Sequence, residues 1–325
     1  MKIVHLILSK GFAGTERYVC DLANYQKDNH KVYIVKLKSD NTKYFKKNTS
    51  KAINFIEMSN FFKSIFLKKI IKKIQPDIVH THLGDASKII KKKWGQYKTV
   101  ATMHMNYNPK YFKNIDGIIC SNNYQLQNIK KQFSGSLFKS YLWPIEKVKK
   151  NKINLKKRLG IPDNYYIFGS IGRFHQQKGF DFLANTFDKM NLKKTALVLV
   201  GNGHLDFIKK YKHNKNIFLL DHSECPSHLY QIFDVAVFVS RWESFGITLL
   251  EAMQHRLPII STVHEGNKDW VNKFKILKIK VDNFEHLKKS LLYFRKLKPK
   301  KTSYDLKDFK YKMLCQKIQN FYQDL

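Results

Sequence analysis

Cysteine, proline, glycine and acidic side chains are all scarce in this sequence of 325 residues. Its cysteines, at positions 20, 120, 225 and 315, are 90 to 105 positions apart, and no C-x-x-C pair occurs. This excludes a disulfide scaffold and predicts reduced thiols and no structural zinc. With only 7 prolines and 14 glycines, collagen-like and low-complexity classes are also excluded.

Long apolar runs are missing as well. No stretch approaches the roughly 18 uninterrupted apolar residues of a membrane span. The apolar start, Met1–Leu8, is too short for a signal peptide. We therefore expect a protein that stays in the cytoplasm.

The chain nevertheless has ample material for a core, since 43% of its residues are hydrophobic and 14% are aromatic. That composition excludes disorder. Because single cores stop growing near about 250 residues, the length predicts two domains.

The charge is strongly one-sided: 60 Lys and Arg against 25 Asp and Glu give a net charge of +35. This would attract any polyanion, whether nucleic acid, anionic lipid or a phosphorylated substrate. Only six of the sixty cations are arginine, and the abundance of Lys, Asn and Ile is equally consistent with AT-rich coding. No zinc-finger spacing, RNP-type motif or heptad repeat is present, so no specific nucleic-acid partner is predicted.

Short β-branched runs alternate with helical stretches along the whole chain, which predicts α/β domains with doubly wound parallel sheets. The predicted strands are Lys2–Leu8, Lys31–Leu37, Asp77–His82, Lys98–His104, Gly117–Asn122, Tyr165–Gly172, Ala196–Gly201, Ile217–Asp221, Val235–Ser240 and Leu257–Thr262. We expect two Rossmann-like domains facing across a cleft, at residues 1–146 and 147–303. Lys147–Lys157 is interpreted as the linker, and a C-terminal helix at residues 304–325 is expected to pack back on the first domain.

The first chemical motif is Gly172-Arg-Phe-His-Gln-Gln-Lys-Gly179, directly after a predicted strand. Ligands of open α/β sheets bind at the carboxyl ends of the strands. Arg173 can donate two parallel hydrogen bonds to phosphate oxygens, and Lys178 adds a point charge, so the loop suits a diphosphate. A solvated basic loop is the competing interpretation.

The second motif, Glu243-Ser-Phe-Gly-Ile-Thr-Leu-Leu-Glu251, follows the predicted strand Val235–Ser240. A helix is expected to begin near Gly246, and its first amides, from Phe245 to Thr248, would form an anion site. Glu243 before the helix and Glu251 inside it could accept hydrogen bonds from sugar hydroxyls at the two ends of a nucleotide sugar. The alternative is an acid at the helix N-terminus and a solvent-facing Glu251.

Together with LVGNG at Leu199–Gly203 and HRLPIIST after the second motif, these residues resemble the retaining glycosyltransferases of the GT-B fold, family 4 (group 1 type). A looser similarity continues through the first half in GFAGTERYVCDLA, PDIVHTH, TMH and IICSN. The resemblance implies transfer of a sugar from a nucleotide-sugar donor to a saccharide or lipid-linked saccharide, with retention of configuration. The acceptor would belong to cell-envelope polysaccharide or lipopolysaccharide synthesis.

The resemblance also implies roles for single residues. Arg173 and Lys178 would bind the donor diphosphate, and the amides of Phe245, Gly246 and Ile247 its distal phosphate. Glu251 would hold the ribose and Glu243 a hydroxyl of the transferred sugar. The residues expected from the first domain are His104, facing the donor sugar, and Gly14, close to the diphosphate. No metal or other cofactor is implied, because the cations and the helix terminus would carry the charge stabilisation. The residues implied as catalytic are His104, Arg173, Lys178 and Glu243; those implied in donor binding are Gly14, Arg173, Lys178, Glu243, Phe245, Gly246, Ile247, Thr248 and Glu251.

Two further features admit two interpretations each. His80 and His82 end a strand, but as metal ligands they lack a third partner, which favours core or cleft-lining roles. Asn60–Gln75 predicts an amphipathic helix, with Phe66, Leu67, Ile70, Ile71 and Ile74 on one arc and Phe61, Phe62, Ile65 and four lysines on the other. That lysine arc suits an anionic membrane surface or a plain solvated face. A catalytically inert GT-B-like subunit and a basic nucleic-acid-binding protein remain the alternative functions.

Overall fold

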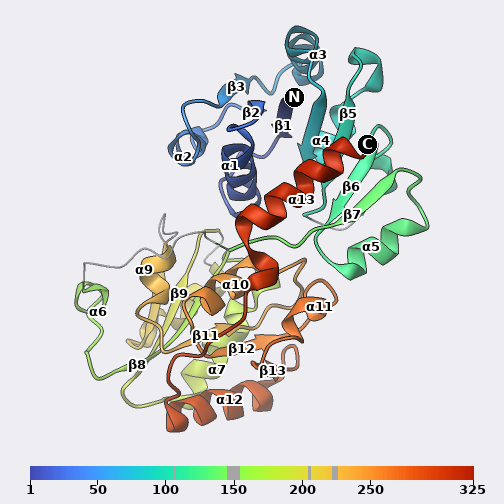
Figure 1. Cartoon of the computed structure of the whole chain (residues 1–325). Helices are drawn as coiled ribbons and strands as arrows, with labels where there is room; N and C mark the ends of the chain where they lie inside the picture. The colour runs from blue at the N-terminus through green and yellow to red at the C-terminus, as the bar shows by residue number, and fades with distance from the viewer. Residues whose placement is uncertain (105–106, 145–153, 204–205, 222–225) are drawn as a thin grey trace. The chain divides into compact units, whose positions relative to one another are not determined.

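The computed structural model describes residues 1–104, 107–144, 154–203, 206–221 and 226–325. The chain forms two compact units (Figure 1). Unit 1 contains Met1–Trp143 together with Asp308–Leu325, and unit 2 contains Pro144–Lys307. The end of the chain therefore returns to the unit in which the chain begins.

Unit 1 alternates strands with helices along its length. Its elements are β1 (Lys2–Ile7), α1 (Gly14–Gln26), β2 (Lys31–Leu37), α2 (Thr42–Asn48), β3 (Asn54–Met58), α3 (Lys63–Ile74), β4 (Ile78–His82), α4 (Gly84–Ile89), β5 (Lys98–Thr102), β6 (Gly117–Cys120), α5 (Asn123–Lys130), β7 (Ser136–Lys139) and α13 (Tyr311–Gln323). Its strands form one parallel sheet in the order β3-β2-β1-β4-β5-β6-β7. The order reverses beside β1, as in doubly wound nucleotide-binding folds.

Unit 2 repeats this arrangement. Its elements are α6 (Leu155–Arg158), β8 (Tyr166–Ile171), α7 (Phe180–Met190), β9 (Thr195–Val200), α8 (Asp206–Lys209), β10 (Ile217–Leu220), α9 (Pro226–Tyr230), β11 (Val235–Phe238), α10 (Ile247–Gln254), β12 (Ile259–Thr262), α11 (Lys268–Val271), β13 (Leu277–Ile279) and α12 (Phe284–Leu297). The strand order β10-β9-β8-β11-β12-β13 is again all parallel and reverses beside β8.

Every strand predicted from the sequence is present, and so the predicted fold class is confirmed. Three strands were not predicted: β3, β7 and β13. All three lie at a sheet edge. These three strands are only partly buried and lack the continuous apolar run that marks a central parallel strand. In β7, for example, every described side chain is exposed or half-buried. The fourth edge strand, β10, is a continuous apolar run and was predicted.

The predicted helices differ from the observed ones mainly at their starts. The C-terminal helix begins at Tyr311, not at Tyr304. Residues 301–306 have no regular structure, a 3₁₀ turn follows at Lys307–Phe309, and the Tyr304 hydroxyl donates a hydrogen bond to the Leu257 carbonyl. The helix α3 begins at Lys63 rather than Asn60. Most of the predicted linker, residues 147–153, lies outside the described residues, and its end is a helical turn at α6 rather than coil.

The helix α13 covers one face of the unit 1 sheet, beside α1 (Figure 1). Its buried side chains are Leu314, Cys315, Ile318, Gln319, Phe321 and Tyr322. The ring of Phe321 stacks on Phe138 of β7 at 5.2 Å between centroids. Because α13 is amphipathic, this packing buries an apolar face that would otherwise contact water.

Candidate active site

The loop after β8 carries the two cations of the first motif. Arg173 is exposed, whereas Lys178 is half-buried at the end of a single 3₁₀ turn, Gln176–Lys178. Gly179 ends the loop with a φ of +67°, and a Cβ there would lie 2.3 Å from the Val239 carbonyl oxygen. Only glycine fits this position, because a side chain would meet backbone and strain the dihedral angle.

The LVGNG turn after β9 packs directly against this loop. The Phe174 amide donates a hydrogen bond of 2.7 Å to the Asn202 carbonyl. A Cβ on Gly201 would lie 1.7 Å from the Gly172 carbonyl oxygen. The glycines therefore allow two neighbouring strand-end loops to touch backbone to backbone, which holds the loop that carries Arg173 and Lys178 in one conformation.

Lys178 and Glu243, from the two separate motifs, form an ion pair. Their side chains are only 17% and 13% exposed. The Ser240 hydroxyl donates a second hydrogen bond, of 2.8 Å, to the same carboxylate oxygen of Glu243. The structure thus brings the first and second motifs together at the carboxyl-end edge of the unit 2 sheet, with a cation and an anion side by side.

Arg241 connects the loop after β11 with the loop after β8. The sequence motifs did not predict this role for Arg241. Its guanidinium pairs with both carboxylate oxygens of Asp181 at 2.9 and 2.8 Å and with Asp282 at 2.8 Å. It also donates to the Gln176 carbonyl, and the Arg241 amide donates to Gln177. The hydrogen bonds that Arg241 donates to the carboxylates of Asp181 and Asp282 raise the pKa of Arg241 above its ordinary value. One feature of the sequence pointed to Arg241: arginine is scarce, and only arginine can make bidentate contacts with a carboxylate.

The helix α10 begins at Ile247, after Gly246 with a φ of +89°, which confirms the predicted start. The amides of Leu249 and Leu250 are the first to bond within the helix, both to the Gly246 carbonyl. The amides of the preceding turn, from Phe245 to Thr248, belong to the N-terminal end, where the helix dipole favours an anion. Phe245 itself is buried and packs on the Trp270 ring.

Glu251 is buried inside unit 2, with 5% of its surface exposed, so the alternative of a solvent-facing carboxylate was wrong. The hydroxyl of Tyr230 lies 3.2 Å from Glu251 Oε2 and 3.0 Å from the Thr248 carbonyl oxygen. A buried carboxylate needs hydrogen-bonding partners. Tyr230, from α9, supplies one of them and fixes the carboxylate against α10.

The loop after β12 also packs against the loop that carries Glu243. The sequence motifs did not predict a role for it. His264 Nε2 lies 2.7 Å from the Ser240 carbonyl oxygen and 3.0 Å from Thr262 Oγ1. Burial lowers the pKa of His264, although the Ser240 carbonyl and Glu243 partly oppose the shift, so the ring is neutral at pH 7. A Cβ on Gly266 would lie 2.1 Å from the Glu243 carbonyl oxygen. The one feature of the sequence that indicated this close contact is Gly266, a glycine shortly after a strand end.

Unit 1 contains the other two predicted residues. Gly14 is exposed and is the first residue of α1, a helix whose N-terminus is capped by the Glu16 side chain on the Ala13 amide at 2.8 Å. His104 follows β5, and its ring packs edge-on against Tyr18 at 5.2 Å. Burial lowers the pKa of His104 to about 3, so this ring is also neutral at pH 7.

His104 adjoins a layer of histidines buried in unit 1. His5 of β1 pairs in register with His80 of β4, and His82 ends the same strand. All three have no exposed surface. The burial of His80 and His82 confirms their predicted place in the core. The expectation that they lack a third possible ligand was wrong, because the parallel pairing of β1 and β4 brings in His5, 75 positions away.

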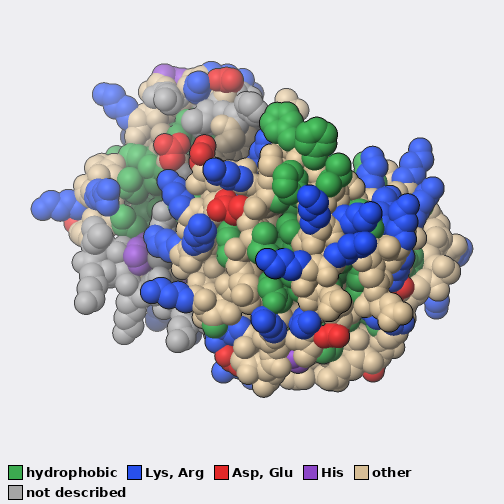
Figure 2. Space-filling model, turned by 90° about the horizontal axis from the view of Figure 1, so that it is seen from above, with side chains coloured by type: hydrophobic (Ala, Val, Ile, Leu, Met, Phe, Trp, Pro, Cys, Tyr) green, Lys and Arg blue, Asp and Glu red, His purple; other side chains and the backbone are tan. Residues whose placement is uncertain are grey.

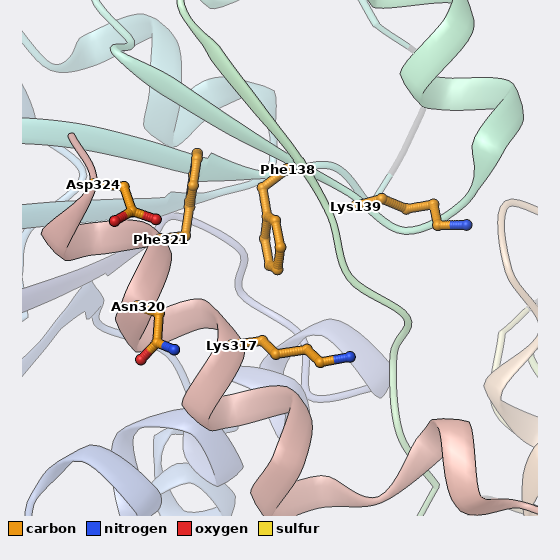
Figure 3. Close-up of a pocket in the computed structure, with 6 residues that line it drawn as sticks. All are labelled: Phe138, Lys139, Lys317, Asn320, Phe321 and Asp324. Carbon is orange, nitrogen blue, oxygen red and sulfur yellow. The ribbon is translucent and has the colours of Figure 1, made fainter.

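An open pocket of about 300 Å³ lies elsewhere in unit 1, between β7 and α13. It is lined by Phe138, Lys139, Lys317, Asn320, Phe321 and Asp324. In the close-up, the Phe138 and Phe321 rings lie side by side, and the Lys139 ammonium points away from them (Figure 3). None of the residues predicted to act in catalysis or donor binding lines this pocket.

Two doubly wound parallel sheets, with paired charges and a helix N-terminus at one sheet's carboxyl-end edge, are the features of a GT-B glycosyltransferase. The family comparison agrees: residues 151–312 match the model of glycosyl transferases group 1, and residues 12–148 match glycosyltransferase family 4. The chain belongs to the group 1 glycosyltransferases.

Individual proteins are more distantly similar. An uncharacterized glycosyltransferase of Methanocaldococcus jannaschii, MJ1059, is 27% identical over 235 residues, 60% of this chain and 57% of that protein. The O-antigen biosynthesis glycosyltransferase WclY of Escherichia coli is 27% identical over 143 residues, 38% and 40% of the two chains. The alignments thus span less than two thirds of these relatives. The Anabaena Alr3699/HepE structure in complex with UDP and glucose superposes over 100% of both chains with a TM-score of 0.85 at 15% identity, which confirms the GT-B fold.

Proposed function

We propose that this chain transfers a sugar from a nucleotide-sugar donor to a saccharide or lipid-linked saccharide, with retention of anomeric configuration. We place its product in cell-envelope polysaccharide or lipopolysaccharide synthesis. The observation that carries the proposal is the Lys178–Glu243 pair at the carboxyl ends of the unit 2 strands. The name of WclY, an O-antigen enzyme, supports the choice of acceptor class.

The donor would be held mainly by its anionic diphosphate. Lys178 supplies one cation, Arg173 can add two parallel hydrogen bonds, and the amides of residues 245–248 add the N-terminus of α10. Charge-assisted hydrogen bonds contribute about 1.5–3 kcal/mol each. Such a cradle stabilises the diphosphate as it departs, so the proposal requires no metal ion at this site.

The two glutamates would select the sugars at either end of the diphosphate. Glu251, fixed by Tyr230, accepts hydrogen bonds from the ribose hydroxyls. Glu243 accepts one from a hydroxyl of the transferred sugar, and its contact with Lys178 orients it. In unit 1, the proposal gives Gly14 a diphosphate contact and His104 a donor-sugar contact. The neutral His104 ring can accept or donate a hydrogen bond without adding charge.

The direct test measures donor binding and turnover. A panel of nucleotide sugars should include one that raises the Tm of the wild type, because a ligand that binds only the folded state stabilises it. Lys178→Ala and Glu251→Ala should abolish that Tm shift and lower donor hydrolysis at least about 100-fold. The matched control is the exposed pair on α12, through Lys288→Ala and Glu285→Gln, which should leave both measurements unchanged. Wild-type hydrolysis rates in the two site variants would refute the assignment, and binding without turnover would favour the inert-subunit alternative.

We also propose that the protein binds peripherally to the inner face of the cytoplasmic membrane through the α3 patch, defined as Phe61, Phe62, Ile65 and Phe66. These side chains are 80%, 74%, 55% and 44% exposed. Phe66 was expected on the packed arc but is exposed, whereas the other four predicted positions do pack: Leu67, Ile71 and Ile74 are buried and Ile70 is half-buried. On the face shown in Figure 2, hydrophobic side chains gather beside Lys and Arg. No helix within the described residues is long and apolar enough to cross a bilayer.

The lysines of α3 make anionic lipid the fitting partner. Lys68, Lys69, Lys72 and Lys73 are all exposed on the helix that follows the phenylalanines. A helix that presents aromatic rings among lysines inserts the rings at the headgroup level while the lysines contact acidic lipids, at about 1 kcal/mol per cation. The same combination would bring the enzyme to a lipid-linked acceptor.

A vesicle flotation assay tests this second proposal. The wild type should float with phosphatidylglycerol vesicles at low salt and stay behind with phosphatidylcholine alone. Phe61→Ser with Phe62→Ser should weaken binding at least about tenfold, since each buried phenylalanine contributes roughly 1.5–3 kcal/mol. The matched control is Leu292→Ser with Tyr293→Ser, two exposed apolar residues of α12 in unit 2. Equal loss in both double variants, or no flotation of the wild type, would rule the patch out.

A further inference from the structure

The strongest feature that the proposed function leaves unused is the histidine layer of unit 1. Its core is His5, His80 and His82, each with no exposed surface. One ring nitrogen from each residue lies within 4.8 Å of the other two. The three rings project from β1 and β4, which are adjacent strands in the middle of the sheet.

The hydrogen bonds around the layer define where the lone pairs are. Gln26 Oε1 lies 2.7 Å from His5 Nε2, so that nitrogen carries the proton and His5 Nδ1 presents a lone pair. His82 Nε2 lies 3.1 Å from this lone pair. On the far side of its ring, His82 Nδ1 is buried without any hydrogen-bonding partner.

We propose that His5, His80 and His82 form a binding site for a divalent transition metal ion of the Zn²⁺ class. The nitrogens of His5 and His82 are 3.1 Å apart, close to the separation of about 3.3 Å that two imidazoles have on a tetrahedral ion with bonds of about 2.0–2.1 Å. Three imidazoles, with no thiolate or carboxylate among them, favour zinc, copper or nickel over magnesium or calcium.

Binding would rearrange two hydrogen bonds and release no proton. His5 Nδ1 already presents its lone pair, and the His82 ring proton moves from Nε2 to the unpartnered Nδ1. His80 contributes one nitrogen, while the other keeps its bond to Tyr322, at 2.6 Å, or to Thr102, at 2.7 Å.

The surrounding partners have the arrangement that orients metal-bound histidines. A ligating histidine normally donates its second N–H to an oxygen of the protein. Gln26 of α1 serves His5 in this way, and Tyr322 of α13 is placed to serve His80. The Gln26 amide also lies 3.3 Å from the Tyr322 hydroxyl, so the ion would connect β1 and β4 with α1 and the C-terminal helix. The expected role is structural, separate from the unit 2 site.

Burial keeps these ligands in the form that a metal needs. It lowers the pKa of His5 to about 4 and holds the pKa values of His80 and His82 well below the ordinary value of 6.5. The rings are therefore neutral at pH 7, as a metal ligand must be. Because no ring is exposed, the ion is expected to enter as the chain folds.

The test uses the full chain without a histidine tag, produced in zinc-supplemented medium. After gel filtration, mass spectrometry should find about one Zn²⁺ per chain. Protein unfolded with a chelator and refolded without metal should have a Tm lower by about 5 °C or more, since metal-binding free energy adds to folding. Refolding with Co²⁺ should produce the visible absorption of a four-coordinate ion.

His82→Gln is the discriminating variant, because its amide can still donate to His5 Nδ1 but cannot bind the ion as imidazole does. It should lose the metal and the Tm difference. The matched control is His255→Gln, a buried histidine of unit 2 hydrogen-bonded to Ser227, which should retain both. Anomalous scattering at the zinc edge from wild-type crystals locates the ion even if the variant fails to fold. Metal-free wild type, an ion located elsewhere, or equal metal in His82→Gln would overturn the proposal.

Discussion

Units 1 and 2 share a strand order but place their polar groups differently. In unit 2 the charged side chains lie in loops beyond the strands, where Lys178, Glu243 and Arg241 remain partly exposed and paired. In unit 1 the polar groups lie within the sheet, where His5 and His80 are neutral and completely buried. The comparison teaches that one architecture can gather paired charges at its strand ends and a neutral hydrogen-bonded network within its sheet.

This difference has an energetic basis. The Lys178–Glu243 pair contributes less to folding than its Coulomb attraction alone suggests, because the cost of removing both charges from water offsets much of that attraction. A buried hydrogen-bonded network costs much more to disrupt, because every orphaned partner keeps its desolvation penalty. Substitutions at the unit 2 loops should therefore lower activity, and substitutions within the unit 1 layer should lower stability.

The largest expected effect is on activity in unit 2. Glu243→Gln removes the negative charge but keeps the shape of the side chain beside Lys178. We expect kcat/KM to fall about 100- to 1000-fold, the scale seen when one preorganised group is removed from an active site. The urea midpoint should change much less than kcat/KM, because the new side-chain amide oxygen can still accept the hydrogen bond of Lys178. Steady-state kinetics and urea unfolding on the same preparation measure the activity and the stability. A large loss of stability with full activity would contradict the proposed difference between the two units.

The next largest effect is on both stability and donor affinity, through a single residue of unit 2. Gly179→Ala introduces a Cβ 2.3 Å from the Val239 carbonyl oxygen at a positive φ. We expect unit 2 to lose about 2 kcal/mol or more, and the displaced Lys178 to lower donor affinity. Gly160→Ala is the matched control, since its φ is +69° but nothing lies within 4 Å of the added carbon. If both variants lost equal stability, the dihedral angle rather than the close approach to Val239 would be responsible.

A smaller, purely structural effect is expected in unit 1. Tyr322→Phe removes the hydroxyl between His80 and Gln26 and should lower the free energy of unfolding by about 1–3 kcal/mol. Tyr25→Phe is the control, because its hydroxyl also joins α1 to α13, through Gln316, but in an exposed position. That variant should lose less than about 0.5 kcal/mol. Chemical denaturation measures the free energy of unfolding of both variants. Similar losses would show that the buried hydroxyl contributes no more to stability than the exposed one.

The smallest effect concerns pH. Burial raises the pKa of Asp116, but hydrogen bonds from Lys92 and the Thr99 amide, at 2.7 Å, outweigh it, so the pKa lies below its ordinary value. A lowered folded-state pKa stabilises the fold above the ordinary value of about 3.9, and this contribution is lost as pH falls through the lowered pKa. Asp116→Asn should therefore be less stable than the wild type at pH 7, and the difference should shrink towards pH 3. Thermal melts across this range check the trend; a constant difference would contradict it.

Much of this molecule was predictable because its signals are local. The central strands are continuous apolar runs, and the start of α10 follows from Gly246. Three of the four edge strands of the two described sheets escaped prediction because partial burial weakens that pattern, as in β3 and β13. The predicted site residues of unit 2 were recognisable one motif at a time. Arg241 and His264 were not, because their importance comes from contacts with other loops.

By itself, the sequence determined the class of fold, the order of its elements and the residue types after each strand, since these depend on short-range patterns of hydrophobicity and glycine. Only the tertiary structure decided which of these side chains contact one another. Lys178 meets Glu243 across 65 positions, and His5 meets His82 across 77. The physical reason is that the register and order of parallel strands, rather than distance along the chain, determine which side chains become neighbours.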